Sequence, residues 1–108
     1  MTTFDNREQA FEKKFAHDQD LKFKSEARRN KLLAEWAAAK LGIMGDALPE
    51  YVKSVLRADL QEKGDEDVFR KLRKDFDDKN VAVTDAEIRQ TMGDFLVQAV
   101  AEVEASRS

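Results

Sequence analysis

Few side chains in this sequence could catalyse a reaction or bind a metal. His17 is the single histidine and cysteine is absent, so a zinc site built from four Cys or His ligands is excluded. The spacings Asp18-x-Asp20 and Asp75-x-Asp77 open like a calcium-binding loop, but both lack the third ligand and the glycine that should follow. We interpret these acids as solvated helix faces and expect no metal and no cofactor.

Catalytic and nucleotide-binding motifs are also missing. The sequence contains neither the glycine-rich phosphate loop nor the dinucleotide-binding fingerprint, and a nucleophile with its base cannot be assembled from one histidine and a few hydroxyl groups. His17 is either a pH switch or an ordinary surface residue. Arg28, Arg29 and Lys31 either bind phosphate or a partner's acids, or form the charged outer face of a helix. We therefore expect a protein that is not an enzyme.

Length and charge narrow the class further. The chain of 108 residues has the size of one small domain, and its net charge of −3 argues against a nucleic-acid partner. No apolar run approaches the roughly 18 residues of a membrane span, and the N-terminus lacks the apolar region of a secretory signal. The absence of cysteine fits a reducing compartment. These features predict a soluble, cytoplasmic protein without membrane insertion.

Helix start and stop signals divide most of the chain into four helices with short connections. A capping box of Thr84 and Glu87 opens the last of them. The first helix is expected to end at Gly42, the second to lie between caps at Asp46 and Gly64, the third between Asp65 and Asn80, and the fourth to fray after Ala105. Residues 81–83 are interpreted as an apolar linker.

Apolar residues recur at helical spacing in each of these segments, and Trp36 is expected in the core with them. The pattern predicts an all-α protein: a small antiparallel four-helix bundle over residues 21–108, with a mobile N-terminal arm over residues 1–20. The expected core faces of the last three helices are Leu48, Tyr51, Val52, Val55, Leu56 and Leu60; Val68, Phe69, Leu72 and Phe76; and Ile88, Met92, Phe95, Leu96, Ala99 and Val103.

The phenylalanines near the N-terminus fall on two different faces. On one straight helix, Phe4, Phe11 and Phe15 lie within about 40° of one another. A second stripe, about a quarter-turn away, contains Phe23, Ala27, Ala34, Ala37 and Leu41. We expect the first stripe to face a partner and the second, including Phe23, to face the protein's own core. The alternatives are that residues 1–20 fold back on the bundle or form a disordered leader.

One long run carries a family resemblance. AFEKKFAHDQDLKFKSEARRNKLLAEWAA, residues 10–38, closely resembles the signature of the alphaproteobacterial zeta subunit, a small natural inhibitor of the F-type ATP synthase. Further similarity lies in GDEDVFRKLRKDF, residues 64–76, in TDAEIR, residues 84–89, and at Tyr51. The resemblance covers nearly the whole chain.

The resemblance implies a four-helix bundle whose mobile N-terminal segment inserts as a helix into the catalytic head, between catalytic and non-catalytic subunits near the central shaft. It implies a block of rotation in the direction of ATP hydrolysis, at the cytoplasmic side of the inner membrane. Carried onto this sequence, the inhibitory segment comprises Phe4, Arg7, Glu8, Phe11, Lys13, Lys14, Phe15 and His17, with Arg28, Arg29 and Lys31 as a possible secondary contact.

Two other functions stay open from the sequence. The first is a small ligand-binding bundle, a weak nucleotide sensor without inhibitory activity, that uses Arg28, Arg29 and Lys31 for phosphate. The second is a scaffold whose arm has no role. We expect the free protein to be a monomer, because the helices show no leftover apolar face.

Overall fold

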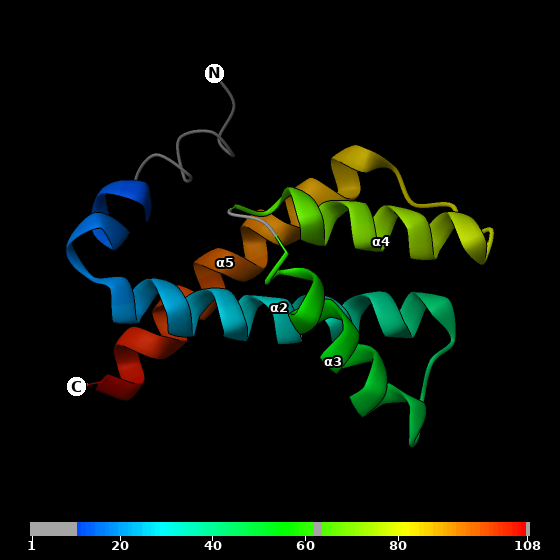
Figure 1. Ribbon diagram of the computed structural model, residues 1–108, viewed down its shortest axis with the longest axis horizontal. Helices are drawn as coiled ribbons and strands as arrows, with labels where there is room; N and C mark the ends of the chain where they lie inside the picture. Colours follow the sequence, from blue (N-terminus) through cyan, green and yellow to red (C-terminus); the bar gives the residue numbers. More distant parts are fainter. Residues whose placement is uncertain (1–10, 62–63, 108) are drawn as a thin grey trace.

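The computed structural model describes residues 11–61 and 64–107, and every regular element in them is a helix (Figure 1). A short helix over residues 11–17 comes first. It is followed by α2 (Gln19–Leu41), α3 (Ala47–Ala58), α4 (Glu66–Asp78) and α5 (Asp85–Arg107). The all-α prediction is confirmed. The four long helices correspond to the four predicted segments, and the helix over residues 11–17 lies inside the predicted arm.

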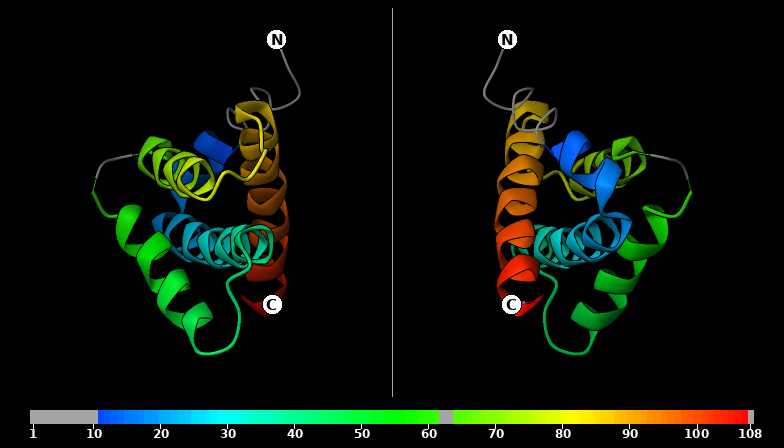
Figure 2. Two further views of the ribbon diagram at one scale, coloured as in Figure 1. Left: turned by 90° about the vertical axis from the view of Figure 1, so that its right-hand side faces the viewer. Right: turned by 90° about the vertical axis from the view of Figure 1, so that its left-hand side faces the viewer.

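Helix α2 lies at the centre and contacts α3, α4 and α5. Viewed along α2, α3 and α5 lie on opposite sides of it and α4 lies above it (Figure 2). Helix α5 crosses α2 obliquely in these views, so its axis departs from the antiparallel alignment expected for a regular bundle. Each of the other long helices thus contributes to a core built around α2.

The main hydrophobic cluster joins all four long helices. Trp36 on α2 is partly buried, and its ring meets the ring of Phe76 on α4 edge to face, with 5.6 Å between centroids. This confirms Trp36 as a core residue. The buried members of the cluster are Leu33, Ala34, Ala37, Val55, Val68, Leu72, Phe76, Val83, Ile88 and Met92.

Two helices end through the same backbone motif. At the end of α2, Gly42 is left-handed with φ 76°, and the Ile43 N–H donates to the carbonyl of Ala38 at 2.9 Å. At the end of α4, Asn80 has φ 57°, and the Val81 N–H donates to the carbonyl of Phe76 at 2.9 Å. These six-to-one bonds satisfy carbonyls that a helix end leaves unpaired. Both predicted helix ends are confirmed.

The predicted end of α3 is wrong. The helix stops at Ala58, and Gly64 belongs to the connection that leads to α4. Leu60, which the pattern assigned to the buried face, is therefore outside the helix and 80% exposed. The spacing of Leu56 and Leu60 continues the helical pattern, but no tertiary contact buries the second leucine.

The helix starts are only partly as predicted. Thr84 Oγ1 accepts a hydrogen bond from the Glu87 N–H at 3.0 Å, so the start of α5 is confirmed. Asp46 and Asp65 precede α3 and α4, but neither side chain makes a capping hydrogen bond. At the other end, α5 does not fray after Ala105 but continues to Arg107.

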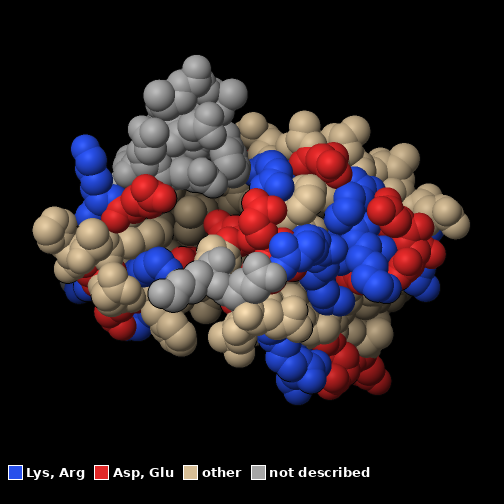
Figure 3. Space-filling model, turned by 45° about the horizontal axis from the view of Figure 1, so that its top comes forward, with Lys and Arg blue, Asp and Glu red and all other residues tan. Residues whose placement is uncertain are grey.

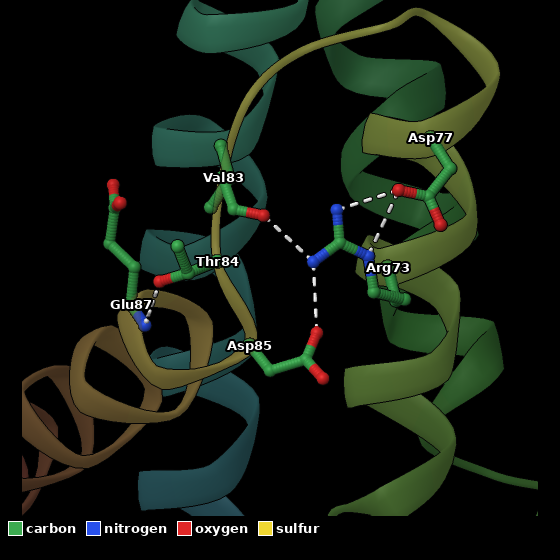
Figure 4. A network of polar contacts seen from close by, with 6 residues as sticks. All are labelled: Arg73, Asp77, Val83, Thr84, Asp85 and Glu87. Atoms are coloured by element: carbon green, nitrogen blue, oxygen red, sulfur yellow. Dashed lines mark hydrogen bonds and ion pairs between the residues drawn. The ribbon is translucent and has the colours of Figure 1, made fainter.

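Residues 81–83 form no strand, as the linker interpretation expected, but they are firmly held (Figure 4). Val83 is 5% exposed, and its carbonyl accepts a hydrogen bond from Arg73 Nη1 at 2.7 Å. Arg73 also pairs with Asp77 at 2.7 Å and with Asp85 at 2.9 Å. The hydrogen bonds to Asp77 and then to Asp85 raise the pKa of Arg73. One guanidinium thus ties α4 to the first residue of α5.

Within the described parts of the chain, no helix is long and apolar enough to cross a membrane. The same residues contain no group of three or more His, Cys, Asp or Glu side chains placed to hold a metal ion.

Candidate partner-binding site

The helix over residues 11–17, here called the docked helix, packs against the C-terminal half of α5. Phe15 is 6% exposed and forms a second hydrophobic cluster with Leu21 of α2 and with Val100 and Val103 of α5. Phe11 is partly buried and stacks on Phe15, with 5.8 Å between ring centroids and 16° between planes. Two of the predicted partner-binding aromatics therefore contact their own chain.

Asp18 separates the docked helix from α2. It is the non-helical residue between them, and its side chain accepts a hydrogen bond from the Leu21 N–H at 2.9 Å, which caps α2. Its second oxygen pairs with Arg107 at 2.9 Å. The bond from Leu21, and then the bond from Arg107, lower the pKa of Asp18. The chain can change direction at this residue because a new helix begins there.

A second ion pair joins the docked helix to α5. Lys14 Nζ lies 2.8 Å from a carboxylate oxygen of Glu104, and both side chains are close to half exposed. Gln19 additionally donates from Nε2 to the carbonyl of Phe15 at 2.9 Å. Polar contacts thus border the small apolar cluster on more than one side.

The predicted core position of Phe23 is wrong, and the contact of Phe15 with a partner stays a prediction. Phe15 is buried, whereas Phe23, which the pattern assigned to the core, is 72% exposed. Ala27 is exposed as well, although Ala34 and Ala37 of the same stripe are buried. The whole stripe lies within α2, but the buried face shifts around this helix along its length: the first half buries Leu21, Ser25 and Arg29, and the second half buries Ala34 and Ala37. Asp18 separates the docked helix from α2, so the position of Phe15 is set independently of that stripe.

The buried face of α2 instead begins with Leu21, Ser25 and Arg29, spaced four residues apart. Arg29 is 0% exposed. Its guanidinium donates to Asn30 Oδ1 at 2.7 Å and to Asp65 at 2.9 Å, and it lies 3.9 Å from Asp59. The interpretation of Arg29 as part of a charged outer face or a phosphate site is therefore wrong. Its four-residue spacing from Leu33 is the signal that would have found it.

The other two basic residues of that trio lie on the surface. Arg28 pairs with Glu102 of α5 at 2.8 Å, and this hydrogen bond raises the pKa of Arg28. Lys31 is exposed. The three side chains therefore do not converge on one site.

The remaining predicted positions are divided. Lys13 and His17 are exposed on the docked helix. Phe4, Arg7 and Glu8 lie outside the described residues. Of the eight residues carried over from the resemblance, the structure brings Phe11, Lys14 and Phe15 together against α2 and α5.

A groove of about 920 Å³ opens between the docked helix, α2, the connection from α3 to α4, and α5. Phe11, Phe15 and Leu96 line it together with the exposed Phe23 and Leu60. Acidic side chains gather around the hollow on this face (Figure 3). Those that line the groove are Glu12, Glu26, Asp59, Asp65 and Glu66. Burial raises the pKa of Asp59 and outweighs the opposing effects of Asn30 and Arg29.

The sequence model of the family described as ATPase inhibitor subunit zeta matches residues 1–102. This chain belongs to that family. The docked helix and helices α2 to α5, here called the α2–α5 core, therefore show the fold of a zeta-family chain. The family consists of regulatory inhibitor subunits.

The fold of this zeta-family chain is also similar to that of a solved structure, described as a solution NMR structure. The two are 40% identical and superpose with a TM-score of 0.69. The similarity covers 80% of this chain and 98% of the other. No protein with curated annotation matches the sequence significantly.

Proposed function

We propose that this protein inhibits ATP hydrolysis by the F-type ATP synthase. In this proposal the docked helix leaves helices α2 to α5, and the N-terminal arm predicted over residues 1–20 inserts into an interface of the catalytic head. There it blocks rotation of the central shaft in the direction of hydrolysis. Membership of the zeta family supports an inhibitory role. The anchoring and pairing residues are those carried over from the resemblance: Phe4, Arg7, Glu8, Phe11, Lys13, Lys14, Phe15 and His17.

The observation that carries the proposal is the separate docking of residues 11–17. They form a short helix of their own, which the single non-helical residue Asp18 connects to α2 along the chain, and they place two stacked aromatic rings on one face. A helix this short is marginally stable alone and takes its stability from the surface it packs against. It can therefore exchange one apolar surface for another, as amphipathic helices do when they bind in a groove.

The α2–α5 core has the role of a holder in this proposal. Its main cluster does not include the docked helix, so the core keeps its own apolar packing when the docked helix leaves. We place the bound protein at the cytoplasmic side of the inner membrane, on the catalytic and non-catalytic subunits of the head, and the free protein as a monomer in the cytoplasm. Neither nucleic acid nor direct membrane insertion has a role.

The test is ATP hydrolysis by a purified alphaproteobacterial F-type catalytic head. Full-length protein should inhibit, and a version that lacks residues 1–17 should not, while Asp18 is kept to cap α2. Phe11→Ala should weaken inhibition, because Phe11 is a proposed anchor. Phe23→Ala is the matched control: it removes the same ring from an exposed position outside the docked helix. Equal inhibition by the full-length and shortened proteins would contradict the proposal.

The nucleotide-sensor alternative gains no support from the geometry. Arg29 is buried against Asp65, and Arg28 pairs with Glu102. A phosphate would have to displace a carboxylate from each of them. Among the described charged residues that line the groove next to Arg29, five are acidic and three are basic, so the balance of charge disfavours a phosphate.

A further inference from the structure

We propose that the C-terminal end of α5, residues 100–107, is an autoinhibitory latch that holds the docked helix away from its partner. This inference rests on the proposed function, because it names how the inhibitory segment is regulated. The latch consists of an apolar seat for Phe15 and two ion pairs, one from Glu104 and one from Arg107.

The apolar seat is incompatible with partner binding by the same ring. Phe15 is 6% exposed because Leu21, Val100 and Val103 surround it. A ring that anchors the segment in another protein has to be transferred out of this seat first. Phe11, which stacks on Phe15, would move with it. Binding to α5 and binding to the partner are therefore mutually exclusive for these two side chains.

The two ion pairs act at different points, one within the docked helix and one at Asp18, directly after it. Lys14 pairs with Glu104 from within the helix, and Asp18 pairs with Arg107 at the point where the helix joins α2. All four side chains are between about a third and a half exposed. Pairs of this kind contribute little each, so the latch is weak enough to open without unfolding of the core.

Competition of this kind lowers the apparent affinity for the partner. When a protein binds only in its open form, the apparent dissociation constant is the intrinsic one divided by the open fraction. Changes on α5 that favour the open form should therefore make the protein a better inhibitor. A merely structural role of the same residues would not have this effect.

The experiment compares three full-length variants with the natural sequence: Glu104→Gln, Arg107→Gln and the two combined. The matched control is Glu102→Gln, which removes the same charge from the same helix but breaks the pair with Arg28 of α2. One readout is amide hydrogen exchange of residues 11–17 in the free protein. The second is the concentration that gives half-maximal inhibition of a purified F-type catalytic head.

We expect the combined variant to exchange about two- to tenfold faster over residues 11–17, as befits the loss of two exposed ion pairs. The half-inhibitory concentration should fall by a similar factor, and Glu102→Gln should change neither quantity. Unchanged exchange in the combined variant, or an equal effect of Glu102→Gln, would overturn the latch. Faster exchange with unchanged inhibition would overturn its autoinhibitory role.

The two readouts also separate this inference from the proposed function. If neither the natural protein nor the combined variant inhibits, the proposed function fails, and the autoinhibitory role fails with it. If only the combined variant inhibits, both are supported, because the closed latch then explains the inactive natural protein. Exchange of residues 11–17 is measured without the ATP synthase, so it reports on the contact with α5 in either case.

Discussion

Two apolar clusters stabilise the part of the chain that the structure describes, and they differ in size and in their borders. The main cluster around α2 contains ten buried side chains from all four long helices and from the connection before α5. The small cluster at the C-terminal end of α5 has four, and half-exposed ion pairs border it. A large cluster resists local opening, whereas a small one with solvated borders can open alone. The molecule thus combines a permanent core with one separable contact.

The largest expected effect is a loss of folding stability, and it is tested by removing one phenylalanine ring from each cluster. Phe76→Ala should lower the free energy of unfolding by about 3–5 kcal/mol, because it empties a fully buried site in the main cluster. Phe15→Ala should lower it by less, because the docked helix can detach while the core stays folded. Urea unfolding followed by Trp36 fluorescence is a suitable measurement, since Trp36 contacts Phe76. Equal losses would show that the two clusters unfold as one unit.

The main cluster was largely predictable from the sequence because its signals are local. Helical periodicity identified most of the buried faces of α3, α4 and α5, but it wrongly included Leu60 and missed Ala58 and Val100. Gly42 and Asn80 marked helix ends because left-handed backbone favours these residue types. Such signals depend on a few neighbouring residues, so they survive without knowledge of the tertiary structure.

The small cluster was not predictable in the same way, for two physical reasons. The buried face of α2 shifts around the helix along its length, so its first turns bury Leu21 and expose Phe23, and the break at Asp18 puts Phe15 on a separate helix. Besides Leu21, the seat for Phe15 is built from Val100 and Val103, which lie some 85 positions away and which no local pattern reports. The local spacing of Arg29 from Leu33 indicated its burial, but its partner Asp65 lies 36 positions away, so no local pattern reported the ion pair that makes this burial possible.

The second prediction contrasts a buried ion pair with an exposed one on the same helix. Arg29→Gln should lower the free energy of unfolding by about 3 kcal/mol, because it leaves the carboxylates of Asp59 and Asp65 without their buried partner. Arg28→Gln breaks an exposed pair with Glu102 and should cost about 1 kcal/mol or less. Chemical denaturation of both variants checks the difference. If Arg28→Gln lowered the free energy of unfolding as much as Arg29→Gln, the assignment of the first pair as exposed and the second as buried would be contradicted.

The third prediction concerns the pH dependence of the same region. Burial raises the pKa of Asp59 above its ordinary value of 3.8, despite Asn30 and Arg29, and Glu26 and Asp67 raise it further. Ionisation of Asp59 therefore costs folding free energy. The cost is absent below the unfolded pKa and complete above the folded one. Asp59→Asn removes this cost and keeps an oxygen that can accept a hydrogen bond from Asn30.

The variant should consequently gain stability relative to the natural protein as the pH rises from about 4 to 7. Urea unfolding at several pH values in that range measures the difference in the free energy of unfolding between the variant and the natural protein. If the advantage of the variant decreases with rising pH, the attraction of Asp59 to Arg29, and not its burial, dominates at this position.

The smallest expected effect is at Phe23, and it tests the exposed position of that ring most directly. The ring is 72% exposed, so Phe23→Ser should change the free energy of unfolding by less than about 0.5 kcal/mol. In the Phe15→Ser variant, amide hydrogen exchange over residues 11–17 should be faster, even where the free energy of global unfolding changes little. A loss of several kcal/mol at Phe23 would place its ring in a core. The stripe predicted from the helical periodicity would then be buried from the first turns of α2 onward.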